Sequence, residues 1–333
     1  MAWHVLLTAR ASFDAGAAAR DLLASAGCRV TVADPFGPLA AVPLAAALEG
    51  YDAVLASSDE YSAPFFADSR TAALKCVSRW GVGLDSVDLT AATRAGVVVC
   101  NTPGLLDEAV ADYAWALLFA IARQVASGQA LLRDGGWSIA WGHEVHSKTL
   151  GIVGCGRIGR AVARRAAGFS MRVLGHDPFA PAGSVPGVEL VPLDRLLAES
   201  DFVTLHCALT PANRGMIGAP QLALMKPTAY LVNTARGALV DEGALVAALE
   251  AGAIAGAALD AFAAEPLPAA SPLRTAPRTL ITPHQAFNSV ETGERVSLTA
   301  ARAIVELAAG RRPVHVANPD VLAVPQRRAA LQA

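Results

Sequence analysis

The chain has 333 residues, more than one domain usually holds, so we expect two domains of roughly 150 residues each. Hydrophobic residues make up 53% of it, but the longest unbroken apolar run, residues 114–122, is far shorter than the about 20 residues that cross a bilayer as a helix. With 27 basic and 29 acidic residues, the chain offers no cationic surface for a nucleic acid or an anionic membrane, which leaves a small molecule as the expected ligand.

The N-terminal residues and the cysteines indicate a cytoplasmic protein. Residues 1–7 have no cationic region before the apolar stretch and no small-residue cleavage site, so no signal peptide is expected. The five cysteines are widely spaced and form no C-x-x-C pair, so we expect free thiols and no metal site.

In the first hundred residues, short β-branched runs alternate with Ala- and Leu-rich helical stretches, which is typical of parallel βαβ units. The expected strands are residues 4–9, 29–32, 53–56, 74–78 and 97–100. A long helical segment over residues 109–132 follows and leads to Gly135 and Gly136, where the pattern breaks.

A second series of strand-like runs begins after Lys148, at residues 150–153, 171–175, 202–206, 229–233, 256–260 and 280–282. Six parallel strands with crossover helices make the doubly wound fold that binds dinucleotides. A last helix, residues 291–309, and a Pro-containing tail are expected to return to the first domain. The predicted fold is therefore α/β, with two Rossmann-like or flavodoxin-like, doubly wound parallel-sheet domains. The dinucleotide domain, residues 102–284, is inserted in a substrate-binding domain built from residues 1–101 and 285–333.

A glycine-rich loop directly follows the first strand of this second series and leads into a helical pattern. Its G-x-G-x-x-G spacing suits a dinucleotide: the first glycine permits a tight turn, the second lets the backbone approach a pyrophosphate, and the third lets the helix pack on the strand. The candidate cofactor-binding residues here are Gly154, Gly156, Arg157, Ile158 and Gly159. The alternative, a glycine-rich turn without a ligand, does not explain why strand, loop and helix stand in register.

Asp177 selects the dinucleotide. It follows the second strand of the series, where a carboxylate can accept hydrogen bonds from the adenosine ribose hydroxyls. A 2′-phosphate would be repelled there, and the neighbours His176, Pro178 and Phe179 include no arginine that could counter the repulsion. The sequence therefore predicts NAD rather than NADP.

Three polar residues stand at the carboxyl ends of later strands, the edge where open α/β sheets bind ligands: Arg236, Asp260 and His284. Glu265 lies on the connection that leaves Asp260. Singly, each could be a surface charge. Together, a carboxylate beside a histidine stabilises the imidazolium, and a guanidinium can hold a substrate carboxylate, which are the functions that reduction of a 2-oxo acid needs. His206, at the same edge, is expected to line the cofactor site.

Three stretches resemble the signature sequences of the D-isomer-specific 2-hydroxyacid dehydrogenases, namely residues 233–242, 258–266 and 282–286. The similarity extends over most of the chain and includes residues 81–85, 101–104 and 205–210. The resemblance implies that His284 is the acid/base, Glu265 its partner, Arg236 the substrate-binding arginine and Asp260 a partner of the nicotinamide carboxamide.

The resemblance implies further contacts. Thr234 and Ala235 join Arg236 and His284 at the cofactor, and the backbone N–H groups of Val82 and Gly83 receive the substrate carboxylate across the interdomain cleft. It also implies a homodimer that pairs through the apolar helix at residues 109–122 and the segment around Trp137 and Trp141.

Two residues depart from the family pattern. Asp107 stands where many members have a threonine near the cofactor, and Asp112 replaces a glutamate in the interdomain helix. The second change keeps the charge. The first is expected to weaken cofactor binding or to alter the cleft.

The expected substrate loop, residues 57–62, carries two acids and an aromatic, which favours small 2-oxo acids such as glyoxylate, hydroxypyruvate or pyruvate. Arg79, near the carboxylate-binding turn, keeps phosphoglycerate as an alternative. Two other classes of protein fit the sequence less well. A non-enzymatic NAD(H)-sensing module is disfavoured by the short chain ends, and a methyltransferase would not need the complete glycine motif and the Arg/Glu/His set.

Overall fold

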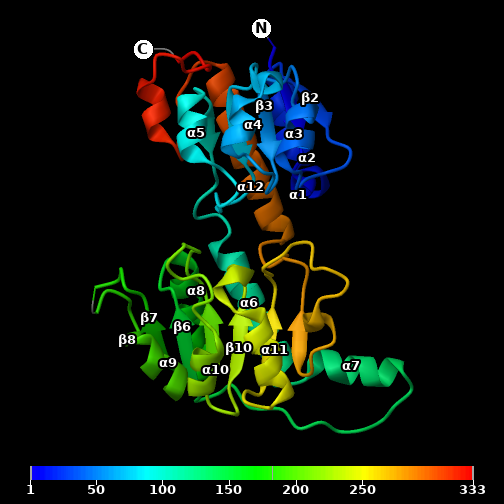
Figure 1. Cartoon of the computed structure of the whole chain (residues 1–333), viewed down its shortest axis with the longest axis vertical. Coiled ribbons are helices and arrows are strands. Elements are labelled where there is room, and N and C mark those ends of the chain that lie inside the picture. Colours follow the sequence, from blue (N-terminus) through cyan, green and yellow to red (C-terminus); the bar gives the residue numbers. More distant parts are fainter. Residues whose placement is uncertain (1, 182, 332–333) are drawn as a thin grey trace. The chain divides into compact units, whose positions relative to one another are not determined.

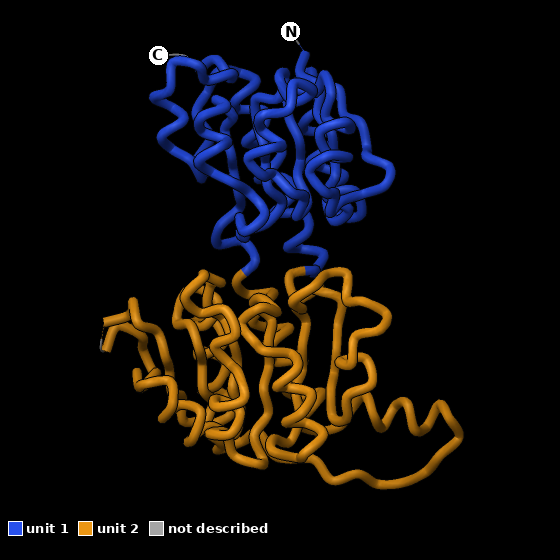
Figure 2. Tube along the Cα trace, in the orientation of Figure 1, with its two compact units in different colours: residues 1–106, 288–333 blue, residues 107–287 orange. Residues whose placement is uncertain are grey.

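The chain divides into two compact units in the computed structural model, which describes residues 2–181 and 183–331 (Figures 1 and 2). Unit 1 comprises residues 1–106 and 288–333, and unit 2 comprises residues 107–287. The boundaries expected from the sequence, after residues 101 and 284, lie a few residues before these divisions.

Unit 1 is built on a five-stranded parallel sheet with the strand order β2-β1-β3-β4-β5. Its strands are β1 (His4–Leu7), β2 (Arg29–Val32), β3 (Ala53–Ala56), β4 (Cys76–Arg79) and β5 (Val98–Cys100). Its helices are α1 (Arg10–Ala15), α2 (Ala17–Ser25), α3 (Ala41–Ala47), α4 (Ala63–Ala67), α5 (Leu89–Arg94) and α12 (Val290–Ala308). The central strand β3 is buried along its whole length, as expected of a parallel sheet covered on both faces.

The C-terminal segment is part of unit 1. Helix α12 packs against α2 and β4, and the chain beyond it pairs Val316 with Cys100. The Asn318 side chain then accepts a hydrogen bond from the Val99 N–H at 2.8 Å and donates one to the Val97 carbonyl at 3.0 Å. These bonds satisfy backbone groups at the edge of the sheet.

Unit 2 is built on a seven-stranded parallel sheet with the order β12-β11-β10-β9-β6-β7-β8. Its strands are β6 (Thr149–Val153), β7 (Arg172–His176), β8 (Glu189–Leu190), β9 (Phe202–Leu205), β10 (Tyr230–Asn233), β11 (Gly256–Leu259) and β12 (Thr279–Ile281). The remaining helices are α6 (Asp107–Ala122), α7 (Val125–Arg133), α8 (Arg157–Ala166), α9 (Leu193–Glu199), α10 (Ala219–Leu224) and α11 (Glu242–Glu250). The two doubly wound parallel sheets confirm the predicted fold class. Strand β8 was not predicted, because two residues are too few to show a periodic pattern.

Helices cover both faces of the unit 2 sheet. Ile152 packs in one apolar cluster with residues of α6 and α8, whereas its neighbour Val153 packs in another with residues of α9, α10 and α11. Successive side chains of a strand point to opposite faces, so one five-residue strand serves both clusters. The strand order reverses at β6, which places the loop after it at the topological switch point of the sheet.

The helical segment expected over residues 109–132 is helical but is not one continuous helix. Gln124 has a left-handed backbone with φ of 53°, and the helix breaks there into α6 and α7, whose axes differ by 60° (Figure 1). Helix α6 is an apolar core helix, while α7 buries none of its residues. In the described part of the chain, no single helix is long and apolar enough to cross a membrane. Helices α6 and α7 have the required length and apolar composition only when the two are counted together across the bend.

Candidate active site

The glycine loop lies between β6 and α8, and its three glycines meet different surroundings. Gly154 has φ of +95°, and a Cβ there would stand 2.5 Å from the Cys207 backbone nitrogen. A Cβ on Gly159 would stand 2.1 Å from the Gly154 carbonyl oxygen. A Cβ on Gly156 would meet no atom of the described residues within 4 Å. Two glycines are therefore required by the packing of the chain itself, and the third leaves open space at the start of α8.

The residues around this open space fit a dinucleotide. Gly156 is the N-cap of α8, and the first N–H groups of a helix, here those of Arg157 and Ile158, have no acceptor within the helix. Asp177, directly after β7, holds the loop from the other side: its carboxylate accepts hydrogen bonds from the N–H groups of Cys155 and Phe179, each at 2.9 Å. The bond to Cys155 was not predicted, because it joins residues from two different strand ends.

His206 and Thr234 lie side by side beyond neighbouring strands, because Leu205 pairs with Asn233 in the sheet. The His206 Nδ1 and Thr234 Oγ1 atoms are buried without a hydrogen-bond partner among the described residues. Burial lowers the pKa of His206 to about 3, so the ring is neutral, and its Nε2 lies 2.9 Å from the Thr204 hydroxyl. Buried polar atoms rarely stay unbonded, so this pair fits a ligand with polar groups.

The segment after β10 carries Arg236. Asn233 fixes its backbone by donating to the Arg236 carbonyl at 2.9 Å and accepting from the Ala235 N–H at 3.0 Å. A Cβ on Gly237 would stand 1.9 Å from the Phe262 carbonyl carbon, so only glycine lets this segment pack on the chain that leaves β11. This packing brings Arg236 to the side of the Glu265 loop.

His284 and Glu265 form a hydrogen-bonded pair in which the His284 Nδ1 and Glu265 Oε2 atoms lie 2.6 Å apart. The other Glu265 oxygen accepts from the Phe262 N–H at 2.9 Å. Burial acts to raise the pKa of Glu265, but the His284 hydrogen bond and charge, the Phe262 N–H and the Arg236 charge outweigh it, and the pKa lies below its usual value. The pair therefore has an ionised carboxylate on Nδ1, while Nε2 has no protein partner in the described part of the chain.

Asp260 braces the backbone that carries His284. The side chain is wholly buried and accepts hydrogen bonds from the Thr282 hydroxyl at 2.6 Å, the Gln285 N–H at 3.0 Å and the Ala286 N–H at 2.8 Å. Burial raises its pKa, although these bonds oppose the shift. The sequence did not predict this bracing role. The predicted hydrogen bond between Asp260 and the carboxamide of the nicotinamide stays a prediction.

In unit 1, the turn after β4 presents two unused donors. Gly81, with φ of +123°, bonds Thr102 through its N–H at 3.1 Å, and the Asn101 side chain donates to the Val82 carbonyl at 3.1 Å. The N–H groups of Val82 and Gly83 donate to no protein acceptor among the described residues. Consecutive free N–H groups of this kind form a concavity that suits an anion.

The expected substrate loop is buried more deeply than its polar sequence suggested. Asp59 and Tyr61 are wholly buried, and the Asp59 carboxylate accepts from the Thr8 hydroxyl at 2.6 Å and the Tyr61 hydroxyl at 3.1 Å. The interpretation that these two side chains face a substrate was therefore wrong. Ser58 is exposed at this loop, and it accepts a hydrogen bond from Arg79 at 2.8 Å.

The two departures from the family pattern have different surroundings. Asp112 pairs with Arg165 of α8 at 2.6 Å, so the shorter acid still links α6 to α8. Burial raises the pKa of Asp107, and the charge of Arg157 opposes this shift. Asp107 therefore lies within electrostatic reach of the glycine loop.

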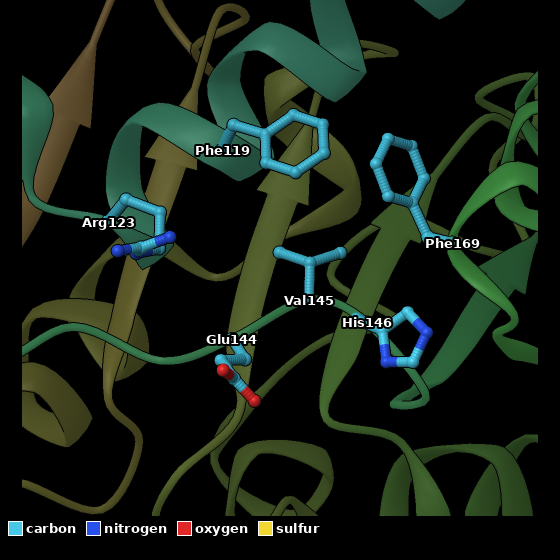
Figure 3. A pocket seen from close by; sticks show the side chains of 6 residues that line it. All are labelled: Phe119, Arg123, Glu144, Val145, His146 and Phe169. Carbon is cyan, nitrogen blue, oxygen red and sulfur yellow. The ribbon is translucent and has the colours of Figure 1, made fainter.

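A separate pocket lies at the opposite, amino-terminal edge of the unit 2 sheet, where the chain enters β6 and β7 (Figure 3). Its lining combines two phenylalanines with charged side chains: Phe119, Arg123, Glu144, Val145, His146 and Phe169. It contains no residue of the strand-end cluster and does not belong to the candidate active site.

The chain is similar to known dehydrogenases. Residues 115–286, which include Arg236, Glu265 and His284, match the family model described as D-isomer specific 2-hydroxyacid dehydrogenase, NAD binding domain. A glyoxylate reductase from Korarchaeum cryptofilum (strain OPF8) is 46% identical over 259 residues, which cover 75% of this chain and 78% of that protein. A D-3-phosphoglycerate dehydrogenase from Methanocaldococcus jannaschii is 41% identical over 250 residues, covering 74% of this chain and 48% of that protein. The solved structure of the TT0316 protein from Thermus thermophilus has a TM-score of 0.84 at 38% identity and covers 94% of this chain and 99% of that one.

Proposed function

The chain belongs to the family of D-isomer-specific 2-hydroxyacid dehydrogenases, NAD-dependent oxidoreductases that interconvert 2-hydroxy and 2-oxo acids, and we propose that its oxo acid is a small one, glyoxylate, hydroxypyruvate or pyruvate. The observation that carries the reaction class is the 2.6 Å pair of His284 and Glu265 at the strand-end edge that also holds Arg236. Glyoxylate reductases among its relatives support the substrate class.

The residue roles follow from this geometry. When bound, NADH supplies the hydride that reduces C2 of the oxo acid. His284 donates a proton from Nε2 to the carbonyl oxygen, while Glu265 holds the ring through Nδ1 and stabilises its charged form. Arg236 offers its guanidinium to the carbonyl oxygen and the carboxylate. In the oxidation direction, the same His284 nitrogen accepts the hydroxyl proton.

We propose that the turn after β4 in unit 1 binds the carboxylate of the substrate. The free N–H groups of Val82 and Gly83 support this assignment, because two adjacent donors match two carboxylate oxygens.

The test measures the turnover of a panel of oxo acids by the His284→Asn variant. The oxidation of NADH reports the rate. We expect kcat to fall by about 10²- to 10⁴-fold, which is the usual contribution of a general acid, while NADH binding measured by titration stays within about threefold. His146→Asn, at an exposed histidine of the same unit, is the matched control. Near-normal turnover by a folded His284→Asn protein would refute the role.

One observation favours a second candidate, phosphoglycerate dehydrogenase activity. Arg79 ends β4 directly before the carboxylate turn and is tied to Ser58 at 2.8 Å, so a guanidinium stands where a substrate phosphate could be bound. The relative from Methanocaldococcus jannaschii supports the same candidate. If it is right, Arg79→Gln should raise KM for phosphohydroxypyruvate at least tenfold and leave KM for hydroxypyruvate nearly unchanged.

A homodimer is also proposed. Helix α7 and the segment after it form an arm, residues 125–142, that extends from unit 2 (Figure 1). Its side chains Trp137, Ile139 and Trp141 are each more than 80% exposed. Apolar exposure on this scale in one short segment favours burial against a second copy of the chain.

A further inference from the structure

Arg160 and Asp177 are anchored to the same residue of the glycine loop. The Arg160 Nε donates to the Cys155 carbonyl at 3.0 Å, and the Cys155 N–H donates to the Asp177 carboxylate at 2.9 Å. The backbone nitrogen and oxygen of one residue lie only roughly 3 Å apart. A cation and an anion therefore flank one short piece of the loop at the adenosine end of the expected cofactor site.

The Arg160 guanidinium is available to a ligand. Arg160 is an exposed residue of α8, and Nε is the one side-chain nitrogen that bonds to the protein among the described residues. Among the described residues, Arg160 and Asp177 do not form an ion pair with each other. No guanidinium nitrogen of Arg160 lies within 4.0 Å of the Asp177 carboxylate. The two Nη nitrogens can thus bond a group that enters beside Asp177.

This arrangement places a guanidinium close to the residue that selects the cofactor. The sequence neighbours of Asp177 carry no guanidinium, which favoured NAD over NADP. Arg160, 17 positions earlier in the chain, is brought to the same loop by the first turn of α8. In dinucleotide folds, a carboxylate at this strand end bonds the ribose 2′-hydroxyl of NAD, and a nearby arginine accommodates the 2′-phosphate of NADP.

We propose that Arg160 is a second determinant of cofactor choice, which binds the 2′-phosphate of NADP(H) through its free nitrogens and is opposed by the carboxylate of Asp177. The inference rests on the placement of the adenosine ribose at Asp177. NAD(H) remains the preferred cofactor, because the carboxylate repels the phosphate. NADP(H) binding is latent and emerges when that carboxylate is removed.

The test is a binding titration without substrate, so it does not depend on which oxo acid is reduced. Isothermal titration calorimetry gives Kd for NADH and NADPH with Asp177→Ser and with the double variant Asp177→Ser, Arg160→Gln. Asp177→Ser should tighten NADPH at least tenfold relative to wild type. Adding Arg160→Gln should weaken NADPH at least tenfold and NADH less than threefold, as loss of a charge-assisted pair predicts.

The matched control is Arg164→Gln in the same background. Arg164 is a surface arginine of the same helix that pairs with Glu108, so its loss removes the same charge at another place. Equal weakening of NADH and NADPH by Arg160→Gln would overturn the proposal, since it would mean that Arg160 serves the shared pyrophosphate or the loop itself. Equal effects of Arg160→Gln and Arg164→Gln on NADPH would overturn it too. Thermal unfolding of each variant shows whether it is folded, and only folded variants are compared. If Asp177→Ser is unstable, Asp177→Asn replaces it.

Discussion

The His284 Nδ1 and Glu265 Oε2 atoms lie 2.6 Å apart, and the second oxygen of Glu265 is fixed by the Phe262 N–H at 2.9 Å. The carboxylate therefore cannot rotate away from the imidazole without losing a backbone hydrogen bond. Because Nδ1 is occupied, the proton transfer proposed for His284 would use Nε2, and the ring orientation is set by a residue that need not touch the substrate.

Glu265→Gln should lower kcat for oxo acid reduction by about ten- to a hundredfold, because an amide keeps the shape of the contact but not the charge that stabilises a protonated ring. NADH affinity should change less than threefold. Steady-state kinetics and a separate NADH titration measure the two effects. Glu250→Gln, at an exposed carboxylate of α11, is the control. If Glu265→Gln kept full kcat, the orienting role would be wrong.

Asp260→Asn should destabilise the fold by about 2 kcal/mol, because the amide cannot accept from all three donors that the buried carboxylate serves. The backbone around His284 would loosen, so kcat should fall more than NADH affinity does. Urea unfolding and steady-state kinetics test both expectations. Asp241→Asn, which alters only the exposed N-cap of α11, should leave kcat unchanged. An unchanged kcat in Asp260→Asn would mean that the brace has no part in catalysis.

The order of elements and the strand-end residues could be predicted from the sequence, because strand, glycine loop and helix leave a local pattern. His284, Arg236 and Glu265 were singled out in this way as candidates, and the structure brings His284 and Glu265 into contact. The break at Gln124 left no such pattern, since neither Gln124 nor the residues directly beside it are glycine or proline.

Contacts between distant parts of the chain could not be predicted. From the sequence, Asp59 is expected to be an exposed acid in a loop. In the structure it is buried, and it accepts a hydrogen bond from the hydroxyl of Thr8, 51 positions earlier. Asp177 was expected only to bond a ribose, yet its carboxylate also accepts from the Cys155 N–H, 22 positions earlier in the chain. Such bonds depend on how strands are placed beside one another, and neither residue's neighbours in the sequence record that placement.

Gly156→Ala should fold normally and lose at least tenfold in NADH affinity. Its Cβ would meet no atom of the described residues within 4 Å, but it would fill the space that a pyrophosphate would enter. Gly159→Ala should instead lose stability, because its Cβ would stand 2.1 Å from the Gly154 carbonyl oxygen. Thermal unfolding and NADH titration separate the two effects, with Gly168→Ala, also unobstructed, as the control. Normal NADH binding by Gly156→Ala would exclude this loop as the pyrophosphate site.

The double variant Trp137→Ser, Trp141→Ser should be monomeric, because it removes the largest exposed apolar side chains of the arm. Light scattering after size exclusion should give twice 34.2 kDa for the wild type and 34.2 kDa for the variant at micromolar concentration. Val314→Ser, at an exposed valine of unit 1, should remain a dimer. A monomeric wild type, or a dimeric double variant, would contradict the proposed pairing.

His206 should make stability depend on pH below neutrality. The ring titrates near 6.5 in the unfolded chain, whereas burial lowers its pKa to about 3 in the fold, so between these values only the unfolded chain binds the extra proton. Its contribution is complete above pH 6.5 and is lost as the pH falls toward 3, by about 2 kcal/mol at pH 5. Urea unfolding at pH 7 and pH 5 measures this loss. His206→Gln should lose about 2 kcal/mol less than wild type over that interval, and His146→Gln, at an exposed ring, should match wild type. Equal losses in wild type and His206→Gln would show that the buried ring does not resist protonation.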